Sequence, residues 1–282
     1  MLIETQTIGV IGHTGMVGSE AYSYYKRHKY PVYGISTNHK SGFPESTWEE
    51  INDKCDIIFV CVPTPYDFAK KKANFTIVNE VVKKVAPNKI VVLKSTVWPG
   101  FTEKLQKKYS KLYILFNPEF LSRKTARADF EIPDRQILGY TSRSKPKTQE
   151  IMSILPKGKY QKIVKASDAE LIKYAHNVFG AIRIIYANHL YEVCKKLKGN
   201  YENVRDGFAA SEFIGPGILR YMTIFHNDKR GYGGPCFPKD VNSYIEFCDT
   251  LRVPAELIKA TRSANRRILK EQHLTEHKVE KY

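Results

Sequence analysis

Residues 7–18 read TIGVIGHTGMVG, in which a strand pattern over residues 7–11 leads directly into a glycine-rich turn. A helical pattern follows and continues to about His28. A strand, a glycine turn and a helix bring backbone N–H groups and a helix N-terminus to one point, where they can hold a pyrophosphate. The spacing is G-x-x-G-x-x-G, one residue longer than the usual fingerprint. The residues that we expect to contact a dinucleotide in this turn are Gly12, Gly15, Met16 and Val17.

Further along the chain, patterns typical of buried strands alternate with helical patterns. The strand patterns lie at residues 31–35, 55–62, 89–94, 112–116, 137–139 and 160–164. This alternation predicts an α/β fold with a Rossmann-like, doubly wound and mainly parallel sheet. Ligands bind at the carboxyl ends of such strands. We therefore expect the cofactor to be bordered by Val62, Pro63, Thr64 and Thr96. Residues 70–74 are expected to form a polar loop.

The end of the second strand leaves the choice of cofactor open. In NAD-binding folds an acidic residue at this place holds the hydroxyls of the adenosine ribose. Here the place is taken by Ser36, and Lys40 follows it closely. Ser36 could itself contact the ribose of NAD. A hydroxyl with basic neighbours could also meet a 2′-phosphate, so NADP is not excluded.

A long helix is predicted over residues 168–198, because no proline interrupts them. Its 31 residues would span roughly 46 Å. We expect Ser167 to cap the helix and Gly199 to end it. Its apolar residues cover most of the circumference, which predicts that it is largely buried. A helix longer than the domain beside it usually joins two domains or forms a contact between subunits. We therefore expect two copies of the chain to form a homodimer in which this helix is the contact.

A second stretch, residues 231–240, reads GYGGPCFPKD and centres on Cys236. Gly233 and Gly234 permit close backbone approach and positive φ angles, and Pro238 suits the first turn of a helix. Cys236 would then lie just before a helix N-terminus and beside a lysine, and both features raise the thiolate fraction of a cysteine. The alternative is a structural thiol, since free cysteines are usually buried and unreactive.

Length and composition limit the class of protein. The 282 residues suggest two domains, and the net charge of +16 comes from 45 basic against 29 acidic residues. The basic residues are scattered, which favours a solvated surface or an anionic small molecule over nucleic acid. Five cysteines without paired or zinc-like spacing indicate a reducing compartment and no metal site. No apolar run is long enough to span a bilayer, so we expect a cytoplasmic protein.

Five segments, in this order and approximate spacing, resemble the UDP-glucose/GDP-mannose dehydrogenase family. They are residues 61–65, residues 95–97, residues 117–121 with 129–130 and 133–135, residues 169–173 with 177, and residues 231–240, and the likeness extends over about residues 7–269. The resemblance implies that the protein uses NAD to oxidise the C6 alcohol of a nucleotide-sugar in two hydride transfers. The substrate it implies first is UDP-glucose, which would give UDP-glucuronate. It also implies that Cys236 forms a thiohemiacetal and then a thioester with the sugar. The domains would be a Rossmann domain (1–166), a helical central and dimerisation domain carrying the cysteine (167–269) and a polar tail (270–282), which we expect to be frayed or only partly ordered.

The resemblance assigns further residues to this chemistry. The residues implied in catalysis are Cys236, Lys173, Asn177, Asp240, Glu119 and Thr96. The residues implied in substrate binding are Phe120, Leu121, Lys173, Asn177, Tyr232 and Gly233.

Each implied catalytic residue has a role that suits its side chain. Lys173 and Asn177 would hold the developing oxyanion. Asp240 would position water and the lysine, Glu119 would act as general base in thioester hydrolysis, and Thr96 would belong to the same water network. Lys173 and Asn177 share a helix face with Glu170. The alternative is that these three residues are an ordinary polar stripe on the helix surface.

Besides the longer glycine turn and Ser36, three features depart from the family. Arg123 replaces a second family glutamate, and Phe213 replaces an arginine that family members often carry. Family members also continue into a C-terminal nucleotide-binding domain, whereas this chain stops soon after Asn265. The alternatives are a truncated homologue that binds cofactor without catalysis, or one that depends on a partner supplying a UDP-binding domain. A basic nucleic-acid-binding protein is the weakest alternative.

Overall fold

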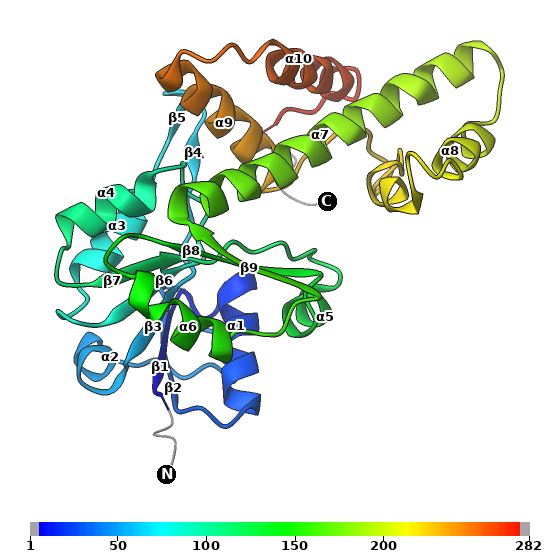
Figure 1. The fold of residues 1–282 in the computed structure, drawn as a ribbon. Coiled ribbons are helices and arrows are strands. Elements are labelled where there is room, and N and C mark those ends of the chain that lie inside the picture. The colour runs from blue at the N-terminus through cyan, green and yellow to red at the C-terminus, as the bar shows by residue number, and fades with distance from the viewer. Residues whose placement is uncertain (1–5, 277–282) are drawn as a thin grey trace. The chain divides into compact units, whose positions relative to one another are not determined.

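The computed structural model describes residues 6–276 and divides the chain into two compact units (Figure 1). The first unit comprises Met1–Pro65 and Asn74–Lys173, and the second comprises Tyr66–Ala73 and Tyr174–Tyr282. The division falls inside the long helix α7 (Ala166–Lys196). The sequence-based boundary after residue 166 lies at the start of this helix.

The first unit is built on a seven-stranded sheet with the order β2-β1-β3-β6-β7-β8-β9. Neighbouring strands run parallel except β7 and β8, which are antiparallel. The predicted doubly wound, mainly parallel sheet is therefore confirmed. The strands are β1 (Ile8–Ile11), β2 (Val32–Ile35), β3 (Ile57–Val60), β6 (Ile90–Leu93), β7 (Tyr113–Phe116), β8 (Arg135–Tyr140) and β9 (Tyr160–Lys165).

Helices cover both faces of this sheet (Figure 1). One face carries α2 (Trp48–Lys54), α3 (Thr76–Lys83) and α4 (Phe101–Lys108). The other face carries α1 (Met16–Arg27), α5 (Ala126–Glu131) and α6 (Thr148–Ile154), and a short 3-10 helix, η1 (Lys145–Lys147), precedes α6.

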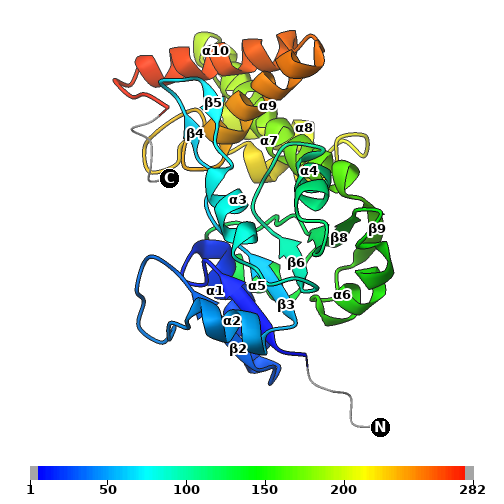
Figure 2. The same cartoon turned by 90° about the vertical axis from the view of Figure 1, so that its left-hand side faces the viewer.

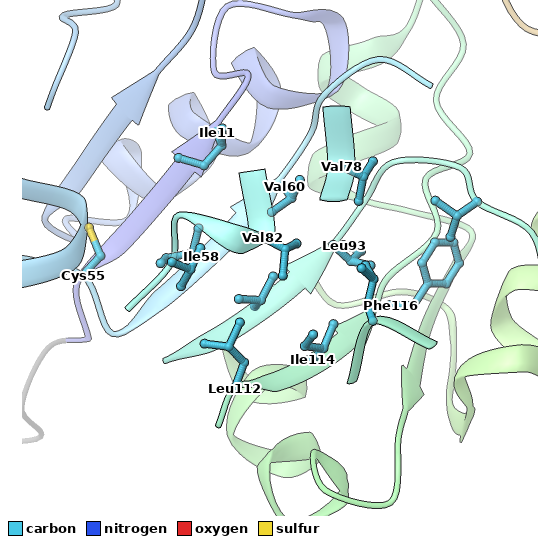
Figure 3. Packing of buried hydrophobic residues seen from close by; sticks show 14 of the residues in the cluster. Ile11, Cys55, Ile58, Val60, Val78, Val82, Leu93, Leu112, Ile114 and Phe116 are labelled. Atoms are coloured by element: carbon cyan, nitrogen blue, oxygen red, sulfur yellow. The ribbon is translucent and has the colours of Figure 1, made fainter. Parts of the chain in front are cut away.

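Side chains of the strands alternate between the two faces, as the pleat of a strand requires. Ile58 and Val60 enter one core, shown in Figure 3 with residues of α3 and the neighbouring strands. Ile57 and Phe59 enter the other core. Because both faces are buried, these strands are continuous apolar runs, which is why they could be found in the sequence.

The second unit contains the rest of α7, α8 (Tyr201–Ala209), η2 (Pro216–Tyr221), α9 (Phe237–Leu251) and α10 (Glu256–Lys270). A hairpin of β4 (Tyr66–Asp67) and β5 (Lys72–Ala73) also belongs to it and lies beside α9 (Figure 2). The Ala73 N–H donates to the Glu246 carboxylate of α9 at 2.8 Å. The prediction of a polar loop over residues 70–74 was therefore wrong for residues 72 and 73, which form β5.

Helix α7 differs from its prediction at both ends. It begins at Ala166, so Ser167 lies inside its first turn rather than capping it. After the helix, Lys198 adopts the left-handed conformation (φ 53°) that usually falls to glycine. Gly199 donates its N–H to the Cys194 carbonyl at 2.9 Å and closes the turn.

The burial expected of α7 is also incomplete. Phe179, Tyr186 and Val193 are 56%, 46% and 41% exposed, and each lies seven residues after the one before. Seven residues are close to two helical turns, so the three side chains share one face. The prediction that the helix is largely buried was wrong for this face.

The polar tail is held in place as far as it is described. The Gln272 side chain accepts the Arg230 N–H at 2.8 Å, and the buried Glu276 pairs with Arg266 at 2.9 Å. Residues 271–276 are thus ordered, and residues 277–282 lie outside the described part of the chain.

Glu170, in the second turn of α7, joins this helix to the start of α4 within the first unit. Its carboxylate accepts the Gly100 N–H (2.5 Å) and both the N–H (2.8 Å) and the hydroxyl (2.5 Å) of Thr102. These N–H groups belong to the first turn of α4, which has no intrahelical acceptors for them. The side chain is fully buried, and burial raises the pKa of the Glu170 carboxyl to about 7.

We predict that Glu170 makes the stability of the protein depend on pH. Because its pKa is higher in the folded than in the unfolded chain, its stabilising contribution is fully present below pH of about 4.5 and is lost as the pH rises through about 7. Relative to Glu170→Gln, which cannot titrate, the wild-type free energy of unfolding should fall by about 3 kcal/mol over this range. Urea unfolding followed by circular dichroism at each pH measures this difference. A difference that stays constant or grows with pH contradicts the prediction.

Candidate functional site

The glycine turn after β1 is too tight for side chains at two positions. Gly12 has φ +87°, and a Cβ there would lie 2.8 Å from the Cys61 carbonyl oxygen. A Cβ on Gly18 would lie 2.1 Å from the Gly12 oxygen. The turn thus runs close to the loop after β3, at the point where the strand order reverses. Gly15 is the N-cap of helix α1, and Met16 and Val17 form its first turn, where N–H groups without intrahelical acceptors favour an anion, so the turn fits a dinucleotide pyrophosphate.

Other predicted cofactor residues lie at the carboxyl ends of neighbouring parallel strands. Val62, Pro63 and Thr64 follow β3, and Thr96 follows β6. The Ser95 hydroxyl donates to the Val62 carbonyl at 2.7 Å and joins the two loops. The structure therefore brings these residues to the edge of the sheet that carries the glycine turn.

Ser36, directly after β2, is also connected to the glycine turn. Its Oγ lies 2.5 Å from the Thr14 Oγ1. Lys40 is exposed, and its ammonium lies 4.8 Å from the centre of the Phe43 ring.

Glu119, in the loop after β7, has a buried cation as its partner. The Lys94 Nζ lies 3.1 Å from the Glu119 Oε2, and the Lys94 side chain is 2% exposed. The same Nζ donates to the Asn117 Oδ1 at 2.6 Å, and the Asn117 amide donates to the Gln136 Oε1 at 2.7 Å. This network fixes the Glu119 carboxylate and supplies the positive charge that a partly buried carboxylate requires. Sequence reasoning missed Lys94, whose position after a buried strand was the available signal.

Lys173 lies at the end of the first unit and contacts the same loop. Its ammonium donates to the Glu119 backbone carbonyl and lies 5.3 Å from the centre of the Phe120 ring. The Arg135 guanidinium lies 3.9 Å from the same ring. Leu121, next in the chain, packs partly against the core under α1. The first unit therefore gathers Glu119, Phe120 and Lys173 at one place.

Cys236 is the N-cap residue of α9, and Pro238 lies in the first turn, as predicted. All five cysteines are in the described part of the chain, and among them Cys236 alone is exposed. Cys55 and Cys61 differ from it, because burial raises the pKa of each thiol to about 12. Cys236 thus occupies the kind of position, a helix N-terminus, that stabilises thiolates in proteins.

Asp240, one turn into α9, is buried and paired. Its Oδ1 accepts from the Lys239 ammonium at 2.5 Å, and its Oδ2 accepts from the Asn177 amide of α7 at 2.5 Å. Asp240 is 1% exposed and Asn177 is also buried, so this part of α7 is not a solvated polar stripe. The second unit thus places the predicted Asn177 and Asp240 in direct contact.

The glycines before Cys236 adopt a different pattern from the one expected. Left-handed φ angles occur at Gly231 (+87°) and Gly234 (+72°), whereas Gly233 does not share them. Between them, the Tyr232 N–H donates to the Asn265 Oδ1 at 2.8 Å, and the tyrosine ring is buried. The substrate roles of Tyr232 and Gly233 stay predictions.

The predicted catalytic residues therefore form two groups. Thr96, Glu119 and Lys173 belong to the first unit, and Asn177, Cys236 and Asp240 belong to the second. Within residues 6–276, no three His, Cys, Asp or Glu side chains are grouped so that they could hold a metal ion. Over the same residues, every helix is too short or too polar to cross a membrane.

Two models of one protein family match this chain. Residues 32–156 match the NAD binding domain of the UDP-glucose/GDP-mannose dehydrogenase family, and residues 167–267 match its central domain. The cofactor of this chain is accordingly NAD, which the glycine turn fits.

Several relatives bear names from this family. The UDP-glucose 6-dehydrogenase of Rickettsia conorii is 29% identical over 219 residues, which are 75% of this chain and 49% of the relative. UDP-glucose 6-dehydrogenase YwqF of Bacillus subtilis is 30% identical over 234 residues, 78% of this chain and 51% of the relative. The chain thus spans about half the length of the curated relatives it matches.

A solved structure has the same fold. A UDP-glucose dehydrogenase from Pyrobaculum islandicum superposes with a TM-score of 0.79 at 24% identity, covering 97% of this chain and 73% of that chain. The two family matches confirm the resemblance predicted from the sequence: the chain belongs to the UDP-glucose/GDP-mannose dehydrogenase family.

Proposed function

We propose that this chain oxidises a nucleotide-sugar at C6 with NAD, and that UDP-glucose is the substrate and UDP-glucuronate the product. The names of its relatives support this choice of substrate. The observation that carries the chemistry is the exposed Cys236 thiol at the start of α9. One helical turn later, the buried Asp240 carboxylate is held by a lysine and an asparagine.

The proposed reaction removes four electrons from C6 in two oxidations. When bound, NAD accepts one hydride in each oxidation, so one turnover reduces two molecules of NAD. Between the oxidations the Cys236 sulfur adds to the aldehyde carbon and gives a thiohemiacetal, whose oxidation gives a thioester. Water then displaces the thiol and releases the carboxylate. A covalent thioester divides one difficult reaction into easier steps.

The chain's own residues take the remaining roles. Lys173 and Asn177 donate to the oxygen that becomes negative when the sulfur adds. Asp240 orients the water that attacks the thioester, Glu119 takes a proton from it, and Thr96 belongs to the same water network. The further substrate contacts in this proposal are Phe120, Leu121, Tyr232 and Gly233. A cytoplasmic location fits a chain in which none of the five cysteines, all of them in the described residues, forms a disulfide.

A second candidate function is a module that binds NAD but has no catalysis of its own, or that works with a partner supplying a UDP-binding domain. Phe213 favours it, because this side chain is 93% exposed at a position where the family resemblance implies an arginine. Arg123, in place of a family glutamate, is likewise exposed. This candidate predicts NAD binding without NADH formation from any nucleotide-sugar by the chain alone.

Replacing the proposed nucleophile separates these candidates. We expect the wild-type chain to form two NADH per UDP-glucose, and we expect Cys236→Ser to lower kcat by at least about 10³-fold, because a serine hydroxyl is a much weaker nucleophile. Absorbance of NADH under saturating substrate measures both rates.

The matched control is Cys248→Ala, which removes the other cysteine of α9. This thiol is buried, and burial raises its pKa, so the variant should keep its turnover. Unchanged turnover in Cys236→Ser contradicts the covalent mechanism. NAD binding by a wild-type chain that forms no NADH favours the second candidate.

We also propose a homodimer through α7. Phe179, Tyr186 and Val193 form an exposed apolar stripe at seven-residue spacing. Such a spacing suits packing of one helix along an equivalent helix. A second copy of the chain presents the same stripe, so the two can bury each other.

Charges on this stripe should abolish the dimer. We predict that wild type sediments as a dimer and that Phe179→Lys/Tyr186→Lys sediments as a monomer, because buried unpaired ammonium groups are strongly unfavourable. Leu251→Lys is the control, since Leu251 is an exposed apolar residue of α9 outside the stripe. A monomeric wild type, or a variant that stays dimeric in analytical ultracentrifugation, contradicts the proposal.

A further inference from the structure

The structure supplies the carboxylate that the sequence lacks at the end of β2. Dinucleotide-binding folds place an acidic residue there to hold the adenosine ribose, and this chain has Ser36 instead. The Glu45 side chain, nine residues later, reaches the same place. Its Oε2 accepts the Ser36 N–H at 2.9 Å.

The backbone beside Glu45 is fixed to β2. The Ser46 N–H donates to the Gly34 carbonyl at 2.7 Å, and the Gly34 N–H donates to the Ser46 Oγ at 3.2 Å. On the next residue, Thr47, helix α2 begins with a capping box closed by Glu50. The backbone directly after Glu45 is therefore held by hydrogen bonds to β2 and by the start of α2, which limits where the Glu45 side chain can lie.

The extra residue of the glycine turn supports the same arrangement. This residue, His13, is fully buried, and a Cβ on Gly34 would lie 2.4 Å from its Cδ2. Its ring packs against Tyr22 and Phe43, with centroids 5.3 and 5.9 Å apart. Its Nε2 lies 3.4 Å from the Phe43 carbonyl oxygen and 3.9 Å from the Glu45 Oε1. The longer turn thus provides a surface on which the segment carrying Glu45 packs.

One oxygen of the Glu45 carboxylate is left for a ligand. The side chain is 26% exposed, and Oε1 lies 3.9 Å from the Nδ1 of His39, beyond hydrogen-bond distance. Within the described residues, Oε1 accepts no hydrogen bond. Because Ser36 is also bonded to Thr14 of the glycine turn, this oxygen lies at the same end of the sheet as the pyrophosphate cradle.

We propose that Glu45 replaces the missing acid of β2: its carboxylate accepts the hydroxyls of the adenosine ribose and repels a 2′-phosphate, which makes the pocket selective for NAD over NADP. The two departures from the family pattern, the longer glycine turn and Ser36, then belong to one arrangement. The opposing group is the Lys40 ammonium, whose positive charge favours a 2′-phosphate, and the His39 imidazole lies on the same segment. This inference depends on NAD binding by the chain and not on the proposed reaction.

Calorimetric titration with NAD and with NADP, without nucleotide-sugar, tests the proposal. Wild type should bind NAD more tightly than NADP. Glu45→Gln should bind NAD roughly 10- to 100-fold more weakly, as expected for lost hydrogen bonds to a charged group, and should not lose affinity for NADP. The glutamine amide oxygen can still accept the Ser36 N–H, so the variant keeps the local fold. Asp53→Asn, on exposed α2 surface nearby, is the charge control and should bind both cofactors as wild type does.

A rescue variant separates the carboxylate from a general effect on the loop. Ser36→Asp in the Glu45→Gln background returns a carboxylate to the usual place and should restore the NAD preference. The proposal is overturned if Glu45→Gln keeps the wild-type affinities, if the double variant stays unselective, or if wild type prefers NADP. Because no substrate is present, a failure here leaves the dehydrogenase proposal untouched, and absent turnover leaves this inference untouched.

Discussion

The pairing of the buried Asp240 carboxylate is the interaction on which the chemistry proposed for the second unit depends. An isolated carboxylate at this depth costs several kcal/mol, and a lysine and an asparagine offset that cost by donating to its two oxygens. Asn177 belongs to α7, so the same contact fixes the first turn of α9 against that helix. Cys236 begins this turn, and its exposed position is therefore set by a buried ion pair one turn away.

The first unit also pairs a carboxylate with a lysine, at the carboxyl ends of its strands. Glu119 is paired with the buried Lys94, which Asn117 also holds. In both units the charged groups are oriented by the protein before any substrate arrives. Dipoles and charges that are already oriented stabilise developing charge without reorganisation, which suits a reaction that builds and discharges an oxyanion.

The sequence predicted those features that short local patterns encode. Strands buried on both faces are continuous apolar runs, and a proline after Cys236 signals a helix start, so the sheet and the start of α9 could be predicted. The pairs Lys94–Glu119 and Ser36–Glu45 could not, because their partners are separated along the chain and meet only in the folded sheet. The exposed stripe of α7 was missed for a related reason: apolar composition does not say which side of a helix has a partner.

The central claim is that the Cys236 sulfur carries the sugar as a thioester. Intact-protein and peptide mass spectrometry of acid-quenched turnover mixtures with UDP-glucose and NAD tests it most directly. The account predicts a covalent UDP-glucuronyl adduct on the peptide that contains Cys236, which is lost on treatment with hydroxylamine. NADH formation without any adduct, or an adduct confined to another residue, would contradict it.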